Sequence, residues 1–196
     1  AHKQRIESAD RERIEQEIQR MDGVIGDLLR FSRLGTTPAI QRRLLRLAPL
    51  LAALVADEEI EAGARGCRLQ LRSTPELAVI GDPELLRSGL ENILRNAIRY
   101  SPPYAEVEIS AGIAADNVVI SFADRGPGVP ADDLARIFEP YYRSSGSTDS
   151  GGTGLGLAIA RRVFEAHGGS VSAMARHGGG LVVTARIPVA EVMADD

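Results

Sequence analysis

Residues 150–169 read SGGTGLGLAIARRVFEAHGG, a glycine-rich turn that runs into an amphipathic helical pattern. The pattern predicts a helix that begins at Gly154. Glycines let a backbone come very close to another group, and the first turn of a helix offers free N–H groups and a dipole that favour an anion. The segment indicates a phosphate-binding turn, but taken alone it fits a flexible loop before a helix equally well.

Two common phosphate-binding designs do not fit this segment. A P-loop requires a lysine after its glycines, and GGTGLGL has none. A dinucleotide-binding fingerprint requires a strand directly before the glycines, whereas the preceding residues, YYRSSGSTDS, have the composition of a loop. Both designs are therefore excluded.

The composition bounds the remaining classes. A chain of 196 residues and 21.0 kDa is long enough for one full domain and an appended element. The net charge of -4, without a basic block, argues against a nucleic-acid partner. The single cysteine, Cys67, excludes an internal disulfide and is expected in the core. No apolar run approaches the roughly 18 residues of a membrane span.

The first part of the chain predicts a long bundle-type helix over residues 10–34. Its apolar residues follow a heptad spacing, at Ile14, Ile18, Met21, Ile25 and Leu28. We interpret this helix as one arm of a helical hairpin, and a solitary coiled-coil strand is the alternative. GTTPA at residues 35–39 then predicts a linker.

Strand and helix patterns alternate beyond the linker. Strands are predicted at 42–47, 67–72, 77–81, 105–113, 117–124, 169–176 and 180–188. Helices are predicted at 48–66 and 82–101, and from Gly154 onward. Because neighbouring strands are mostly joined by turns, we expect a mixed, largely antiparallel sheet with helices on one face, which is an α+β sandwich.

The motif DRGPGV, residues 124–129, comes directly after a predicted strand. An aspartate held at a strand end can accept a hydrogen bond from the exocyclic amine of adenine, and the carbonyl of guanine at that place would be rejected. Gly126 and Gly128 would let the base approach the backbone. Taken alone, DRGPG also fits a plain turn.

The helix ENILRNAIRYS carries a polar stripe. Asn92, Asn96 and Arg99 stand at i, i+4 and i+7, beside an apolar stripe. Amide oxygens and a guanidinium along one line suit Mg²⁺ and phosphates. The alternative is an ordinary solvated helix face.

A third motif, IFEPYYRSSGSTDSGGTGLGL, joins an aromatic anchor, Arg143 and a polar stretch. Such a stretch can move as a lid over a ligand. A disordered connector is the alternative.

These motifs, in this order, closely resemble those of sensor histidine kinases. NILRNAIRYS is similar to their N box, DRGPGV to their first glycine box, IFEPYYR to their F box and GGTGLGLAIA to their second glycine box. HGGGLVVTARIP is a looser match to the final glycine motif. The predicted bundle helix resembles the second helix of the dimerisation and histidine-phosphotransfer hairpin. The residues of the motifs are most similar to those of the envelope-stress sensor type.

The resemblance implies the GHKL (Bergerat) fold, an α/β sandwich with an ATP lid. It divides the chain into the end of the helical hairpin (1–34), a linker (35–41), a catalytic ATP-binding domain (42–190) and a tail (191–196). It also implies ATP and Mg²⁺ as ligands, a response regulator as partner and a homodimer formed through the hairpin. The whole would be the cytoplasmic portion of a bacterial inner-membrane sensor protein.

Site residues carried over from the resemblance fall into three roles. Asn96 is the expected Mg²⁺ ligand, and Arg143 is the expected catalytic residue at the γ-phosphate. The expected nucleotide-binding residues are Asn92, Asn96, Arg99, Tyr100, Asp124, Gly126, Gly128, Val129, Phe138, Tyr142, Gly152, Thr153, Gly154, Leu155, Gly156 and Leu157.

The family's phospho-acceptor motif, a histidine followed by an acidic residue and Leu-Arg-x-Pro, does not occur. The histidines are His2, His167 and His177. His2 has no acidic neighbour, and the other two are expected to be structural or surface residues. We expect the acceptor upstream of residue 1, so this chain should bind Mg·ATP without labelling itself.

Two other functions stay open. One is a different GHKL enzyme, such as a serine kinase or a chaperone-like ATPase, although the heptad helix and YYR argue against it. In such an ATPase, a water-activating glutamate is expected at the position that Asn92 occupies here. Glu91 lies about 100° round the helix from that position, so intrinsic hydrolysis of ATP should be poor. The other is a non-catalytic dimerisation module with a degenerate nucleotide site.

Overall fold

The computed structural model describes residues 21, 26, 40–72, 75–144 and 153–190. Of the predicted bundle helix only Met21 and Gly26 are described, and both have helical backbone. The rest of that helix, the linker up to residue 39 and the tail from residue 191 lie outside the described residues.

The core of the fold is a five-stranded sheet with the order β2-β4-β5-β7-β6. Strand β2 runs parallel to β4, and every other neighbouring pair is antiparallel. The predicted mixed, largely antiparallel sheet is therefore confirmed. Its strands are β2 (Arg68–Leu71), β4 (Glu106–Ala114), β5 (Asn117–Ala123), β6 (Ser170–Ala175) and β7 (Leu181–Pro188).

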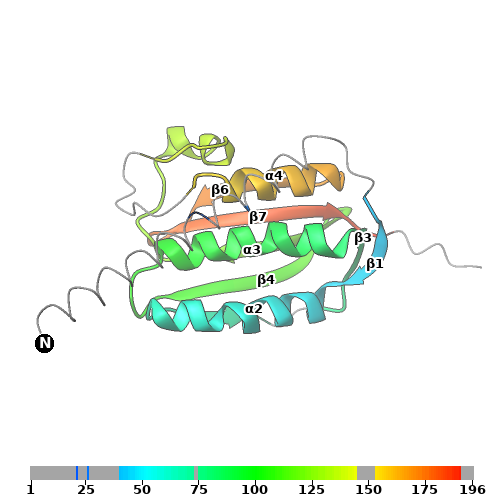
Figure 1. Ribbon diagram of the computed structural model, residues 1–196, viewed down its shortest axis with the longest axis horizontal. Coiled ribbons are helices and arrows are strands. Elements are labelled where there is room, and N and C mark those ends of the chain that lie inside the picture. Colours follow the sequence, from blue (N-terminus) through cyan, green and yellow to red (C-terminus); the bar gives the residue numbers. More distant parts are fainter. Residues whose placement is uncertain (1–20, 22–25, 27–39, 73–74, 145–152, 191–196) are drawn as a thin grey trace, which may run out of the picture.

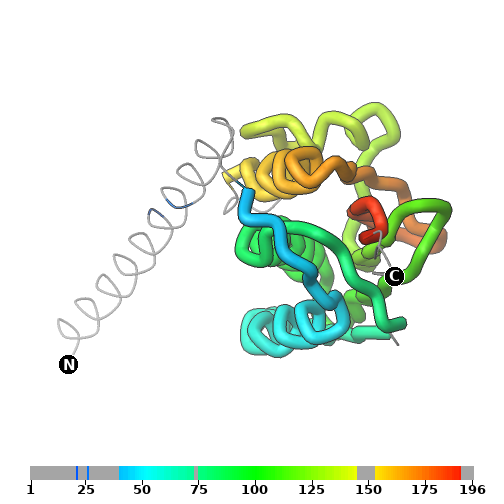
Figure 2. The backbone as a smooth tube through the Cα atoms, turned by 90° about the vertical axis from the view of Figure 1, so that its right-hand side faces the viewer, coloured from blue at the N-terminus to red at the C-terminus, as the bar shows by residue number. Residues whose placement is uncertain are grey.

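Three helices cover one face of this sheet, as Figures 1 and 2 show. They are α2 (Leu47–Ala64), α3 (Pro83–Tyr100) and α4 (Gly156–Ala166). The strands turn their predicted apolar residues to that face, and these side chains are buried. They are Val107, Ile109, Val118, Ile120, Phe122, Leu181, Val183, Ala185 and Ile187. Alternation along each strand thus fixes which face the helices cover.

Helix α3 begins as its sequence predicts. The Asp82 carboxylate accepts hydrogen bonds from the N–H groups of Glu84 and Leu85, and Pro83 stands in the first turn. Its apolar stripe of Leu86, Leu90, Ile93 and Ala97 is buried. Cys67 is also buried, as expected.

Two of the predicted strands lie outside the main sheet. β1 (Arg43–Arg46) and β3 (Ala78–Gly81) form a separate antiparallel ribbon. Each strand has four residues and runs almost directly into a helix, β1 into α2 and β3 into α3. The ribbon therefore lies where these two helices begin (Figure 1).

Helix α4 begins at Gly156 and not at the predicted Gly154. Gly154 has φ +71, which is a left-handed conformation outside the helical range. α4 then packs on α3, where a Cβ on Gly89 would lie 3.0 Å from Val163 and 3.2 Å from Phe164. The missing side chain at Gly89 lets the two helices approach closely. No helix within the described stretches is long and apolar enough to cross a membrane.

Candidate nucleotide-binding site

The polar stripe of α3 meets the start of α4. Asn92, Asn96 and Arg99 are partly exposed. The Asn92 amide nitrogen donates to the Ser88 carbonyl (2.8 Å), and a Cβ on Gly156 would lie 3.0 Å from the Asn92 amide oxygen. Gly156 therefore brings the N-box helix and the second glycine turn into contact.

The two helix starts differ in how their N–H groups are satisfied. Asp82 caps α3, but α4 has no capping side chain among the described residues. The Leu155 N–H donates to the Thr153 hydroxyl (3.1 Å), which closes the turn just before the helix. The first turn of α4 thus presents backbone donors and the positive end of the helix dipole, a suitable place for phosphate.

Asp124 directly follows β5, and it is 3% exposed. Its Oδ1 accepts hydrogen bonds from the N–H groups of Gly126 (2.8 Å) and Leu181 (3.1 Å). Burial raises the pKa of this carboxyl, and the two hydrogen bonds and the nearby Arg176 oppose that rise. Within the described part of the chain no group donates to Oδ2. One oxygen is therefore held by the backbone, and the other can accept from a ligand.

The turn after Asp124 lies against the end of α3. A Cβ on Gly126 would come within 2.6 Å of the Tyr100 carbonyl oxygen. Gly128 has φ +76 and lies beside the Gly180 carbonyl, and Val129 packs against the core. The stripe of α3 thus has the start of α4 at Asn92 and the Asp124 turn at Tyr100, about 12 Å apart along the helix.

The F-box residues form a compact cluster. Phe138 is 6% exposed, and the Arg136 guanidinium lies 4.3 Å from the centre of the Tyr142 ring. The Asp133 carboxylate accepts hydrogen bonds from the hydroxyls of Ser144 (2.6 Å) and Tyr142, which lower its pKa. The same bond to Asp133 raises the pKa of Tyr142.

The two described ends of the expected lid are joined. The Tyr141 N–H donates to the Gly154 carbonyl (2.9 Å), and a Cβ on Gly154 would lie 2.9 Å from the Tyr141 Cα. Arg143 follows with an exposed side chain. Leu155 and Leu157 are buried, and their side chains pack in the hydrophobic core. The expected Gly152 lies outside the described residues.

Sequence reasoning missed the groups that hold Asp124 from the other side. They are Arg176, Gly180 and the backbone of Leu181, all at the turn between β6 and β7. Its run of three glycines, each with positive φ, was the available signal. The motif had only been matched loosely, and nothing in the sequence connects it to a residue more than 50 positions earlier.

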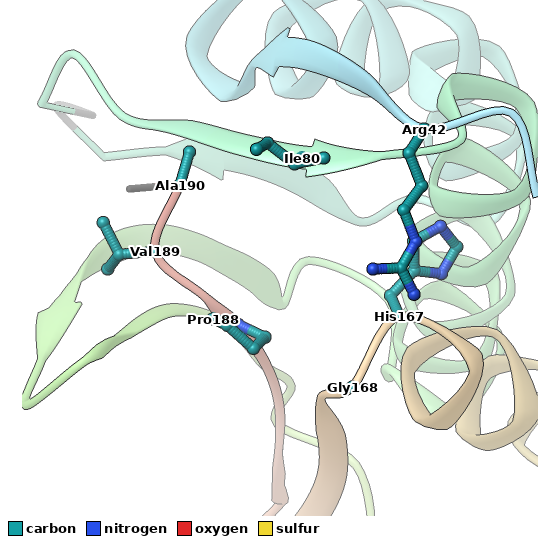
Figure 3. Close-up of a pocket in the computed structure, with 7 residues that line it drawn as sticks. All are labelled: Arg42, Ile80, His167, Gly168, Pro188, Val189 and Ala190. Atoms are coloured by element: carbon teal, nitrogen blue, oxygen red, sulfur yellow. The ribbon is translucent and has the colours of Figure 1, made fainter. Parts of the chain in front are cut away.

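A cavity of about 490 Å³ lies at the opposite end of α3 and α4 (Figure 3). Its lining includes Arg42, Ile80, His167 and Pro188, and none of the predicted site residues. The His167 Nε2 accepts from the Asp82 N–H (3.0 Å), and Nδ1 lies 2.7 Å from the Val163 carbonyl. His167 is buried and fully bonded, a structural residue as expected.

The sequence of this chain is similar to those of known proteins. Residues 81–191 match the family described as histidine kinase-, DNA gyrase B-, and HSP90-like ATPase. Sensor histidine kinase CpxA of Escherichia coli K12 is 38% identical over 186 residues, which are 93% of this chain and 40% of CpxA. Signal transduction histidine-protein kinase BaeS of the same strain is 37% identical over 153 residues, 77% of this chain and 33% of BaeS.

Solved structures of sensor histidine kinases have a similar fold. Full-length ShkA in complex with AMPPNP has a TM-score of 0.74 at 29% identity, over 85% of this chain and 35% of ShkA. The chain thus spans about 40% or less of these relatives' lengths. The matched family, the sheet with three helices on one face and the glycine turns at α3 lead to one conclusion. The chain belongs to the histidine kinase-, DNA gyrase B- and HSP90-like ATPase family, as an ATP-binding catalytic domain of the sensor histidine kinase type.

Proposed function

We propose that this chain, within a longer sensor protein, binds Mg·ATP and delivers the γ-phosphate to a histidine side chain. The observation that carries the proposal is the stripe of α3 between two unlike ends. One end is the start of α4 at Asn92, which no described side chain caps, and the other is the buried Asp124 beside Tyr100. A nucleotide has phosphates at one end and a base at the other, which fits this polarity.

The residues have separate roles in the proposal. Asp124 accepts the adenine amine through Oδ2, and Gly126 lets the Asp124 turn pack against the Tyr100 carbonyl at the end of α3. The N–H groups at Gly156 bind the phosphates. Asn96 offers an amide oxygen, and an ion carried with phosphates needs only one or two protein ligands. Bound magnesium would neutralise charge on the transferring phosphate, and Arg143 would assist.

The acceptor histidine lies elsewhere in the proposal. His167 is buried with both ring nitrogens bonded, and His177 lies in the exposed turn after β6. Neither lies at the start of α4, where the proposal puts the phosphates, so neither is suited to in-line attack. We therefore propose an acceptor on the helical hairpin of the intact protein, which would dimerise through that hairpin. A response-regulator aspartate would then receive the phosphate, beneath a bacterial inner membrane.

The test is magnesium dependence of ATP binding in an Asn96→Ala variant. We expect Mg²⁺ to strengthen ATP binding to the wild type. In Asn96→Ala this increase in affinity should be about tenfold smaller, whereas the affinity for ATP without Mg²⁺ should be unchanged. Asn117→Ala, at the start of β5, is the matched control and should bind like the wild type. Full magnesium dependence in Asn96→Ala would contradict the assignment.

A further inference from the structure

The Arg176 side chain reaches from the β6–β7 turn to the end of β5. Its Nη1 donates to the carbonyl oxygens of Ala123 (3.0 Å) and Asp124 (3.1 Å), and its Nη2 donates to Glu108. The side chain is 12% exposed. We propose that Arg176 is a positioning residue for adenine recognition, acting through Asp124, an inference that rests on the proposed function.

The backbone of the same turn also holds Asp124. The Arg176 N–H donates to the Gly180 carbonyl (3.0 Å), which closes the glycine turn. Gly180 has φ +102, and a Cβ there would lie 2.2 Å from the Asp124 carbonyl oxygen. Only glycine fits this contact. The contact brings Leu181 to Asp124, where the Asp124 N–H donates to the Leu181 carbonyl (3.0 Å) and Oδ1 accepts from the Leu181 N–H.

Asp124 is thus fixed at its N–H, its carbonyl and its Oδ1, and among the groups that the structure describes none bonds Oδ2, which a ligand can reach. Arg176 supplies the bond to the carbonyl. Because it also bonds the carbonyl of the preceding residue, it sets the direction in which the chain leaves β5. A carboxylate must point correctly to accept one hydrogen bond from a base, so this direction decides adenine affinity.

Arg176 is itself held in place by an ion pair. Glu108, on β4, pairs with Arg72 (3.0 Å) on one side and with Arg176 on the other. Hydrogen bonds from Arg72 and Arg176 lower the pKa of Glu108 and keep it charged. The pair restrains a long side chain that would otherwise sample many rotamers.

The test measures ATP affinity by calorimetry for the wild type, Arg176→Met, Arg176→Lys and Asp124→Asn. We expect Arg176→Met to weaken ATP binding about tenfold, because two partly buried carbonyls lose a charged donor. Lysine keeps a charged donor and should recover part of that loss. Arg186→Met is the matched control, because Arg186 lies on β7 and its side chain bonds only the Ser172 hydroxyl (2.8 Å) among the described contacts. It should change ATP affinity less than twofold.

A double substitution separates positioning from general support. If Arg176 acts through Asp124, adding Arg176→Met to Asp124→Asn should weaken ATP binding less than twofold further. Effects that multiply independently, or an Arg176→Met protein that binds ATP like the wild type, would overturn the inference. If Arg176→Met does not fold, Arg176→Lys alone and combined with Asp124→Asn carries the same comparison.

The result also distinguishes this inference from the proposed function. A wild type that does not bind ATP, or an Asp124→Asn variant that binds it unchanged, would refute the adenine assignment and the inference with it. ATP binding that depends on Asp124 but not on Arg176 would refute the inference alone.

Discussion

At the scale of single residues, the Asp124 carboxyl links burial to ligand binding. Its pKa is raised by burial, so it takes up a proton at a higher pH than an ordinary aspartate. Its contribution to folding stability is fully present below the unfolded-state pKa, and it is lost as pH rises through the raised folded-state value. In the proposed complex ATP binding should change in the opposite direction, because the ionised carboxylate is the better acceptor for the adenine amine.

We therefore predict that ATP affinity falls as the pH is lowered, beginning above the ordinary aspartate pKa of about 3.9. Calorimetric titrations at a series of pH values measure this. Asp124→Asn is the control, because the nucleotide's phosphates titrate alike in both proteins and only the carboxyl differs. Parallel pH profiles for the two proteins would contradict the prediction.

Gly126 is predicted to tolerate no side chain, for a reason of space. A Cβ there would lie 2.6 Å from the Tyr100 carbonyl, whereas a Cβ on Gly112 would meet nothing within 4 Å. We expect Gly126→Ala to lower the free energy of unfolding by about 2 kcal/mol and to weaken ATP binding. Gly112→Ala should change stability by less than about 1 kcal/mol. Chemical denaturation measures both changes in stability. Equal losses for the two variants would contradict the prediction, because the structure would then accommodate a side chain beside Tyr100.

The residue types in the sequence predicted the candidate ligand-binding side chains better than they predicted the residues that hold those side chains in place. The stripe of Asn92, Asn96 and Arg99 is a matter of helical spacing, which a sequence displays directly. The partnership of Arg176 with Glu108 spans 68 residues and depends on the sheet order β4-β5-β7-β6. No local pattern encodes that order, so Arg176 could not be predicted.

At the scale of elements, alternation and helical periodicity predicted the strands and helices, but they did not predict which strands pair with one another. The pattern of residues 42–47 identifies a strand, yet its pairing with β3 in a separate ribbon follows from how each strand joins its helix. The start of α4 was misplaced by two residues, because the left-handed backbone of Gly154 arises from its contact with Tyr141.

The contact between α2 and α3 includes a buried carboxylate. Glu58 is 6% exposed, and both its oxygens accept from the Arg95 Nε, at 3.1 and 3.2 Å. Burial raises the Glu58 pKa, and Arg95 opposes that rise. Removing the arginine would leave a buried charge without its main partner.

We predict that Arg95→Met destabilises the protein by about 2 kcal/mol at neutral pH, a value reduced because half of Arg95 is exposed to solvent. The loss should shrink as the pH falls through the raised Glu58 pKa, because the protonated carboxyl needs no cation. Arg87→Met is the matched control. Its partner Asp57, also on α2, is 61% exposed, so it should cost less than about 1 kcal/mol. Urea unfolding at several pH values would reveal a pH-independent loss if the prediction is wrong.

At the scale of the whole molecule, the site is assembled from segments far apart in sequence. The stripe of α3 contacts the start of α4 at Asn92 and the end of β5 at Tyr100, and the β6–β7 turn contacts the end of β5 at Asp124. The sequence motifs predicted that α3, the end of β5 and the start of α4 belong to one site only through their resemblance to a family, and the part played by the β6–β7 turn was missed. Physical reasoning from each motif alone left a plain alternative open, because turns and solvated helix faces use the same residues.

The central claim is that one surface recognises both adenine and phosphates, and nucleotide selectivity tests it most directly. The measurement is calorimetric titration of the chain with ATP and with GTP, each with and without Mg²⁺. The account predicts that ATP binds and that Mg²⁺ strengthens its binding, whereas GTP, which presents a carbonyl to Asp124, binds at least tenfold more weakly. Equal binding of the two nucleotides, or no binding of ATP, would contradict it.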